Sequence, residues 1–334
     1  MKQGIRSGKN WDIVFPGHDG KRNARPPGGN VSVTLNSDYW RYLFPLELAG
    51  TVFLAAGLIA VRRRLSLRLN GLVVLGRVFV AASLATFGAE HLTSARSLMQ
   101  IVPEWMPGRL FWTYFVGLAL FAAAASFVLN RYVRLSASLL GLMFFLFWIL
   151  LDVPAVPANL ADRFTWALFA RELFFALGAW ALAASQFAPR HRTGAHRMVA
   201  ACRVLMGAVL VFYSVEHFLH PEFAPGVPLE QVTLAIIPFA RLWGYLAGAA
   251  LLVGGVAMLA NRHARAAATW LGIAMALLVP IIYVPMLVVA RQPLEITVAI
   301  NYIFDTLLFA GSILFLAEAI PASPAAPSDS GQGA

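Results

Sequence analysis

The sequence predicts an all-α membrane protein with about nine transmembrane helices, arranged as one leading helix and two parallel four-helix bundle repeats. The first observation is composition: 59% of the 334 residues are hydrophobic, 13% are charged, and the mean hydropathy is +0.70. A water-soluble core of this size cannot hide so much apolar surface, so we expect the chain to lie in a lipid bilayer. The second and third observations are the apolar runs of helix length and a long internal correspondence.

The correspondence starts with two apolar runs that read RVFVAASLATFGAEHL and RVLMGAVLVFYSVEHF. Each run starts on an arginine and ends on a Glu-His pair. The matching residues lie 126 positions apart, and they are Arg77 with Arg203, Glu90 with Glu216, and His91 with His217. From Trp112 onward the offset is 131, as for Trp112 with Trp243. This pattern predicts a tandem repeat.

The expected elements follow in chain order. Residues 1–38 form a basic, Gly/Pro/Asn-rich stretch that we expect to be disordered, and residues 42–61 form a leading transmembrane helix. The first repeat spans residues 72–187 and the second spans residues 198–319. Their helices are expected at residues 72–95, 109–129, 134–153 and 164–187, and then at residues 198–219, 238–260, 266–290 and 295–319. The Pro/Ser/Gly/Ala-rich residues 321–334 are expected to be a second disordered tail.

The arginines predict the orientation of the helices. With nine spans, the loops that contain Arg62–Arg64, Arg131 and Arg262 fall on one side, which the positive-inside rule makes the cytoplasm. The interpretation is a multi-pass protein of the bacterial inner membrane whose partner is lipid. The net charge of +10 then reflects orientation and not a nucleic-acid partner. Because each repeat has an even number of spans, both Glu-His pairs are expected near the outer end of their helices.

Residues 102–117, VPEWMPGRLFWTYFVG, contain a Val-Pro-x-Trp-x-Pro loop that enters a helix with Phe-Trp-x-Tyr and Gly. Together with a first helix that ends on Glu-His, this stretch resembles the DoxX-like membrane proteins over residues 72–187 and more loosely over residues 198–319. The resemblance implies a small quinone-linked membrane subunit, as in thiosulfate:quinone oxidoreductase. Because the chain has no flavin or iron–sulfur motif, such a role requires an electron-donating partner subunit.

Ionisable residues inside apolar runs are costly in a bilayer, and they are therefore the candidate functional groups. The candidates for proton transfer or catalysis are Glu90, His91, Glu172, Glu216, His217 and Asp305. Glu172 and Asp305 lie near the middle of the last helix of each repeat, 133 positions apart. Asp152 closes the third helix of the first repeat, where Tyr283 stands in the second.

Three further residues are candidates for cofactor binding. His220 lies one turn after Glu216, and Arg109 and Arg241 open the second helix of each repeat on the outer side. A structural interpretation competes with each of these assignments. Glu90 with Arg109, and Glu216 with Arg241, are expected to form ion pairs at the membrane rim, and the histidines to be packing residues.

Arg171 has its own structural interpretation, which is an ion pair with Asp305 or Glu172. The single cysteine, Cys202, excludes an intrachain disulfide and a cysteine-based metal or redox site, and no metal site is expected. Haem ligation by His91, His217 and His220 is less favoured than packing.

Three functions therefore remain open, and the sequence does not decide whether the protein is an enzyme. In the first, His91 or His217 binds the carbonyl of a quinone, and nearby acids relay the accompanying proton. In the second, the repeats form a proton-coupled carrier in which Glu172 and Asp305 titrate. In the third, the protein is a non-catalytic membrane scaffold or assembly factor, and every buried charge is an ion pair.

Overall fold

The computed structural model describes residues 43–187, 192–226 and 230–321. The expected disordered tails, residues 1–38 and nearly all of 321–334, lie outside these ranges. Within the described ranges, nine helices are long and apolar enough to cross a membrane. The β-structure seen in the same ranges is one isolated bridge between Phe223 and Val232. The structure thus confirms an all-α, multi-pass membrane protein.

The helices agree with the expected spans to within a few residues at most ends. The leading helix is α1 (Phe44–Val61). The first half contains α2 (Leu69–Leu72), α3 (Leu75–Thr93), α4 (Ala95–Leu98), α5 (Arg109–Leu129), α6 (Val133–Phe147) and α8 (Arg163–Ser185). The second half contains α9 (Arg192–Leu219), α10 (Ala240–Leu259), α11 (Ala264–Leu278) and α13 (Pro293–Ala319).

Two of the spans change helix type before they end. A π-helical turn, η2 (Trp148–Asp152), follows α6, and it continues through α7 (Val153–Ala155) and the 3₁₀ turn η3 (Val156–Ala158). A second π-helical turn, η5 (Val279–Tyr283), follows α11 and leads into α12 (Val284–Val289). The two π-helical turns lie 131 positions apart, which is the offset of the sequence correspondence. Pro154 contributes to the first irregularity and Pro285 to the second, because proline removes a backbone donor from the helical ladder.

Matched local geometry continues outside the π-helical turns. Left-handed backbone occurs at pairs of positions that are 131 apart, namely Gly108 with Phe239, Asn130 with Asn261, and Tyr132 with His263. The indole of Trp112 donates to the Pro107 carbonyl at 3.0 Å, and that of Trp243 donates to the Pro238 carbonyl at 3.2 Å. Left-handed backbone is uncommon for residues other than glycine, so its recurrence at one offset supports the predicted repeat. The repeat itself stays a prediction.

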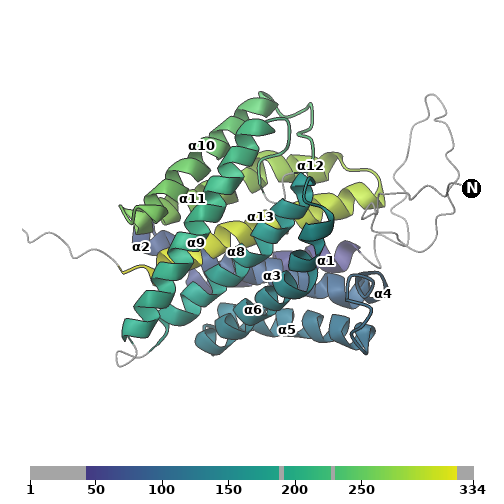
Figure 1. Ribbon diagram of the computed structural model, residues 1–334, viewed down its shortest axis with the longest axis horizontal. Helices are drawn as coiled ribbons and strands as arrows, with labels where there is room; N and C mark the ends of the chain where they lie inside the picture. The colour runs from purple at the N-terminus through teal and green to yellow at the C-terminus, as the bar shows by residue number, and fades with distance from the viewer. Residues whose placement is uncertain (1–42, 188–191, 227–229, 322–334) are drawn as a thin grey trace, which may run out of the picture.

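The helix contacts refine the expected pair of side-by-side bundles. Within each half, the first helix packs on the second and the third on the fourth, as in α3 with α5 and α6 with α8. The last helix of each half then packs on the first helix of the other, α8 on α9 and α13 on α3, and α8 also packs on α13. Each half is therefore completed by the other half, and α13 lies in the middle of the molecule (Figure 1).

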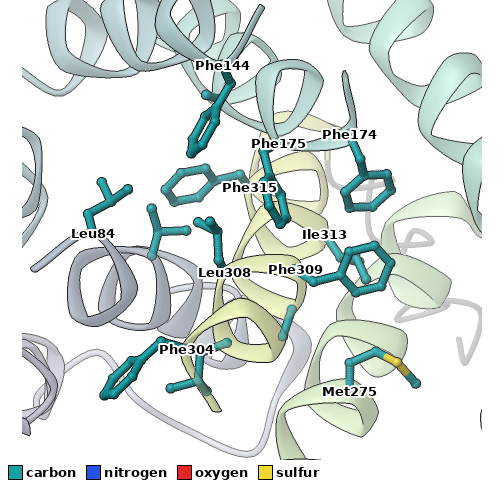
Figure 2. Close-up of a cluster of buried hydrophobic side chains, with 14 of the residues drawn as sticks. Leu84, Phe144, Phe174, Phe175, Met275, Phe304, Leu308, Phe309, Ile313 and Phe315 are labelled. Atoms are coloured by element: carbon teal, nitrogen blue, oxygen red, sulfur yellow. The ribbon is translucent and has the colours of Figure 1, made fainter. Parts of the chain in front are cut away.

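Burial follows this arrangement. In the most apolar stretch of α13, 83% of the residues are buried, against 17% in α1, so α13 is central and α1 faces the surroundings. Aromatic side chains fill the space between α8 and α13, where Phe174 stacks on Phe309 with ring centroids 4.5 Å apart (Figure 2). Gly178 lies directly against Ser312, where a Cβ atom would collide, so this glycine allows α8 and α13 to approach closely.

Candidate functional site

The centre of the candidate site is an arginine that bridges two acids where α8 meets α13. Arg171 Nη1 donates to Asp305 Oδ2 at 3.1 Å, and Nη2 donates to Glu172 Oε1 at 2.9 Å. The exposed fractions of the Arg171, Glu172 and Asp305 side chains are 19%, 13% and 14%, so all three are largely buried. The expected ion pair of Arg171 thus forms with both acids at once. Glu172 and Asp305, which lie 133 positions apart in the sequence, meet at one place.

Two more carboxyl groups lie close to this triad. Asp152, at the end of the π-helical turn η2, interacts electrostatically with Glu172 and Arg171. Glu90, in the last turn of α3, accepts from the Asn301 amide at 3.4 Å and interacts with Asp305, one turn further along α13. We call these residues, Glu90, Asp152, Arg171, Glu172 and Asp305, the carboxyl cluster. The carboxyl cluster thus contains four carboxyl groups and one guanidinium, which pairs with two of them.

Several buried polar atoms around the carboxyl cluster lack a hydrogen-bond partner among the described residues. They are Trp148 Nε1, Asp152 Oδ2, Arg171 Nε, Glu172 Oε2 and Asn301 Oδ1. A buried polar atom without a partner costs about 1–3 kcal/mol, so proteins rarely keep a group of them. Donors and acceptors are both present, and this combination suits protons, water or a small polar ligand.

The two histidines of the Glu-His pairs have the same first contact and different second contacts. His91 Nδ1 lies 2.8 Å from the Phe87 carbonyl, and His217 Nδ1 lies 2.7 Å from the Tyr213 carbonyl. His217 is fully buried, and its Nε2 accepts from the Gly226 amide at 3.2 Å. His91 is only partly buried. With both ring nitrogens bonded to backbone, His217 is a packing residue in this structure.

The expected ion pairs at the membrane rim are wrong. Arg109 Nε donates to the Met99 carbonyl at 3.0 Å and does not reach Glu90, which contacts Asn301. Glu216 pairs with Arg163 at 3.4 Å, and not with Arg241. The physical reason is the face of the helix on which each acid lies. Glu90 faces α13 and Glu216 faces α8, because the two halves interlock.

His220 does not join the other candidates. Its Nδ1 lies 3.5 Å from Glu222 Oε1, and α9 ends at Leu219, directly before it. The carboxyl cluster therefore contains the predicted candidates Glu90, Glu172 and Asp305. The three predicted cofactor-binding residues, His220, Arg109 and Arg241, lie outside it. Among the described residues no three His, Cys, Asp or Glu side chains are grouped closely enough to hold a metal ion.

The sequence did not predict the partners of Glu90 and Glu216, although one of the two partners had a signal. Asn301 lies four residues before Asp305 in an apolar run, so both side chains share one face of α13. That spacing of polar residues could have identified Asn301. Arg163, the partner of Glu216, starts α8 and looks like an ordinary interfacial arginine.

Comparison with known proteins identifies one domain family. Residues 80–160 match a domain of unknown function (DUF8561), and this stretch runs from within α3 to just past the 3₁₀ turn η3. No curated protein and no solved structure matches the chain. The matched stretch contains Glu90, His91 and Asp152, and it ends before α8, which contributes Arg171 and Glu172.

Proposed function

We propose that this protein is a proton-coupled carrier for a small solute, with the carboxyl cluster as its proton-binding site. The observation behind the proposal is the charge count: four carboxyl groups and one guanidinium lie together at the junction of α8 and α13. An uncompensated charge inside a bilayer costs several kcal/mol, so the surplus carboxyl groups need protons or other cations. Binding and release of a proton there changes the charge balance at the junction of the two halves.

The position of the carboxyl cluster supports a carrier. Transporters built from parallel repeats hold their substrates and coupling ions near the middle of the membrane, between the repeats, next to interrupted helices. Here Glu172 and Asp305 lie near the middle of their spans, and the helix before each is interrupted by a π-helical turn. We further propose that the chain is a tandem DoxX-like repeat of the bacterial inner membrane.

A second candidate function is a quinone-linked redox subunit that works with an electron-donating partner. The observation that favours it is the aromatic group next to Asp152. The Trp148 ring lies 5.0 Å from Phe169 and 5.5 Å from Phe145. A quinone head group binds between such rings and needs a proton donor at its carbonyl. In this function Asp152, and not the fully bonded His217, would supply the proton.

Proton flux in reconstituted vesicles tests the carrier. The protein is reconstituted with a pH-sensitive dye inside the vesicles, and small cations, anions and neutral solutes are added in turn outside. We expect one class of solute to drive proton movement, and we expect Asp305→Asn and Glu172→Gln to abolish it. Glu104→Gln is the matched control, because Glu104 is an exposed acid outside the carboxyl cluster.

Two results would overturn the carrier. One is wild-type flux in Asp305→Asn, and the other is the absence of solute-driven flux in the wild type. In the second case, extraction of a quinone from the purified protein would favour the redox subunit. If no quinone is extracted, and the variants lose only thermal stability, the scaffold function is left.

A further inference from the structure

The two halves differ at the last residue of their π-helical turns. In the second half this residue is Tyr283, and the loop after α9 lies buried against it. The Tyr283 hydroxyl donates to the Pro225 carbonyl at 2.7 Å, and the Gly226 amide donates to His217 Nε2. A Cβ atom on Gly226 would overlap the Tyr283 hydroxyl. The backbone of Ala224–Gly226, which we call the plug, thus fills this position.

In the first half, Asp152 stands at the position of Tyr283, and polar atoms there have no partner among the described residues. Asp152 Oδ2 and Trp148 Nε1, one π-helical turn apart, are both buried and unbonded. The loop after α3 instead forms the short helix α4, and Arg109 holds its end through the Met99 carbonyl. Among the described residues, no backbone group therefore bonds to Asp152 Oδ2 or Trp148 Nε1 in the way that the plug bonds to Tyr283.

The surroundings of Asp152 indicate what kind of molecule fits. The Trp148 ring contacts the rings of Phe145 and Phe169, with centroids 5.5 and 5.0 Å away, so three aromatic rings are grouped beside Asp152. Glu172 Oε2, the oxygen of Glu172 not bonded to Arg171, is buried and unbonded as well. The two ion pairs of Arg171 go to Glu172 and Asp305, so Asp152 interacts with this guanidinium electrostatically but has no ion pair with it among the described residues.

Carboxylates beside aromatic faces are the groups that bind an organic cation, through charge pairing and cation–π attraction. We infer that the first half binds a small organic cation between Asp152, Glu172 and Trp148, at the position that the plug occupies in the second half. This inference rests on the proposed carrier and names the class of its solute. A bound cation and a bound proton then compete for the same carboxyl groups, which is the requirement for exchanging one for the other.

Equilibrium binding to the purified full-length protein tests the inference, with benzyltrimethylammonium as the probe. We expect saturable binding of one cation per chain, and no binding of neutral benzyl alcohol. Asp152→Asn and Trp148→Leu should each weaken the affinity about tenfold or more, and Trp148→Phe, which keeps a ring, should weaken it less. Tyr283→Phe is the matched control at the plugged position, and it should leave the affinity unchanged.

A thermal unfolding curve for each variant shows whether it is folded. If the loss of affinity in Asp152→Asn comes from the lost carboxylate and not from misfolding, Asp152→Glu should keep part of the wild-type affinity. Equal affinity for the cation in the wild type and Asp152→Asn would overturn the cation site. If solute-driven proton flux passes its test and benzyltrimethylammonium does not bind, only the cation class fails. If the cation binds as expected but no flux is seen in vesicles, the carrier function fails and the site remains.

Discussion

The two halves have several local features in common, and they differ in what packs beside their π-helical turns. Both have a π-helical turn at the same offset, a histidine bonded to the preceding turn of its helix, and an acid in the middle of the last helix. The second half then fills the space beside its π-helical turn with the plug, whereas the first half leaves Asp152 and Trp148 unbonded. This difference at corresponding positions is the basis for the inference that the first half binds the organic cation.

The two halves also differ in the charged residues that they contribute to the carboxyl cluster. Arg171 of the first half stands 133 positions before Phe304, the same offset that relates Glu172 to Asp305. The guanidinium therefore has an aromatic side chain as its counterpart. The first half supplies the only cation of the carboxyl cluster, and the second half supplies Asp305 to it.

The largest expected effect comes from removing that guanidinium. Arg171→Met leaves Glu172 and Asp305 buried without their partner, and should lower the free energy of unfolding by about 3–5 kcal/mol. Phe304→Met, at the matching position, should cost less than about 1.5 kcal/mol. Denaturant titration in detergent measures both. Arg171→Met with Asp305→Asn should recover part of the loss, and equal losses for the two single variants would contradict the asymmetry.

The histidines give a second comparison of the halves. His217→Ala removes a fully buried ring and leaves the Gly226 amide without its partner, so we expect a loss of about 3 kcal/mol in the free energy of unfolding. His91→Ala, at a partly buried position with one bond, should cost about 1 kcal/mol. The same denaturant titration applies. A larger loss for His91→Ala would mean that its ring has a partner that the structure does not show.

The plug can be tested by crowding it. Gly226→Ala forces a Cβ atom onto the Tyr283 hydroxyl and should cost about 1–3 kcal/mol. Adding Tyr283→Phe removes the colliding oxygen, so the double variant should lose less than the sum of the single losses. Gly194→Ala is the control, since a Cβ atom there meets nothing within 4 Å and it should be neutral or stabilising. Additive losses at Gly226 and Tyr283 would argue against a packed plug.

The smallest expected effect is at the start of α8, just outside its span. The Asp162 carboxylate accepts from the Thr165 hydroxyl and from the Phe164 and Thr165 amides, and these bonds lower its pKa. Asp162→Ala should cost about 1 kcal/mol at neutral pH. Because the folded-state pKa lies below the unfolded value of about 3.9, the contribution is complete above that value. It is lost as the pH falls through the folded-state pKa.

Asp162→Asn provides the control for this cap. Asparagine caps a helix nearly as well and does not titrate, so its stability difference from Asp162→Ala should not change with acid. Thermal unfolding of the three proteins between neutral and acidic pH makes the comparison. A constant difference between the wild type and Asp162→Asn down to the lowest pH would show that the charge of Asp162 contributes nothing.

The spans were predictable because each is a continuous apolar run, and because the same run recurs at a fixed offset. The central triad was predictable in part, since Glu172 and Asp305 match in depth and Arg171 adjoins one of them. The partners of Glu90 and Glu216 were not. They depend on α13 packing on α3 and α8 packing on α9, and these long-range contacts leave no local pattern in the sequence.

The plug was not predictable for a related reason. The Pro225–Gly226 pair indicates a turn, but the depth of that turn is set by Tyr283 and His217, which lie on other helices. Asp152 shows the same limit. Its position at the end of a span was visible, but its proximity to Glu172 follows from the π-helical turn and from α6 packing on α8.

Infrared spectroscopy of the purified protein tests the central claim most directly, because the C=O stretch of a protonated carboxyl group differs from that of a carboxylate. We expect a protonated carboxyl band at neutral pH that shrinks in Asp305→Asn and Asp152→Asn and is unchanged in Glu104→Gln. A wild-type spectrum with no protonated carboxyl band at neutral pH, or a band that none of the cluster variants alters, would rule out proton binding by the carboxyl cluster.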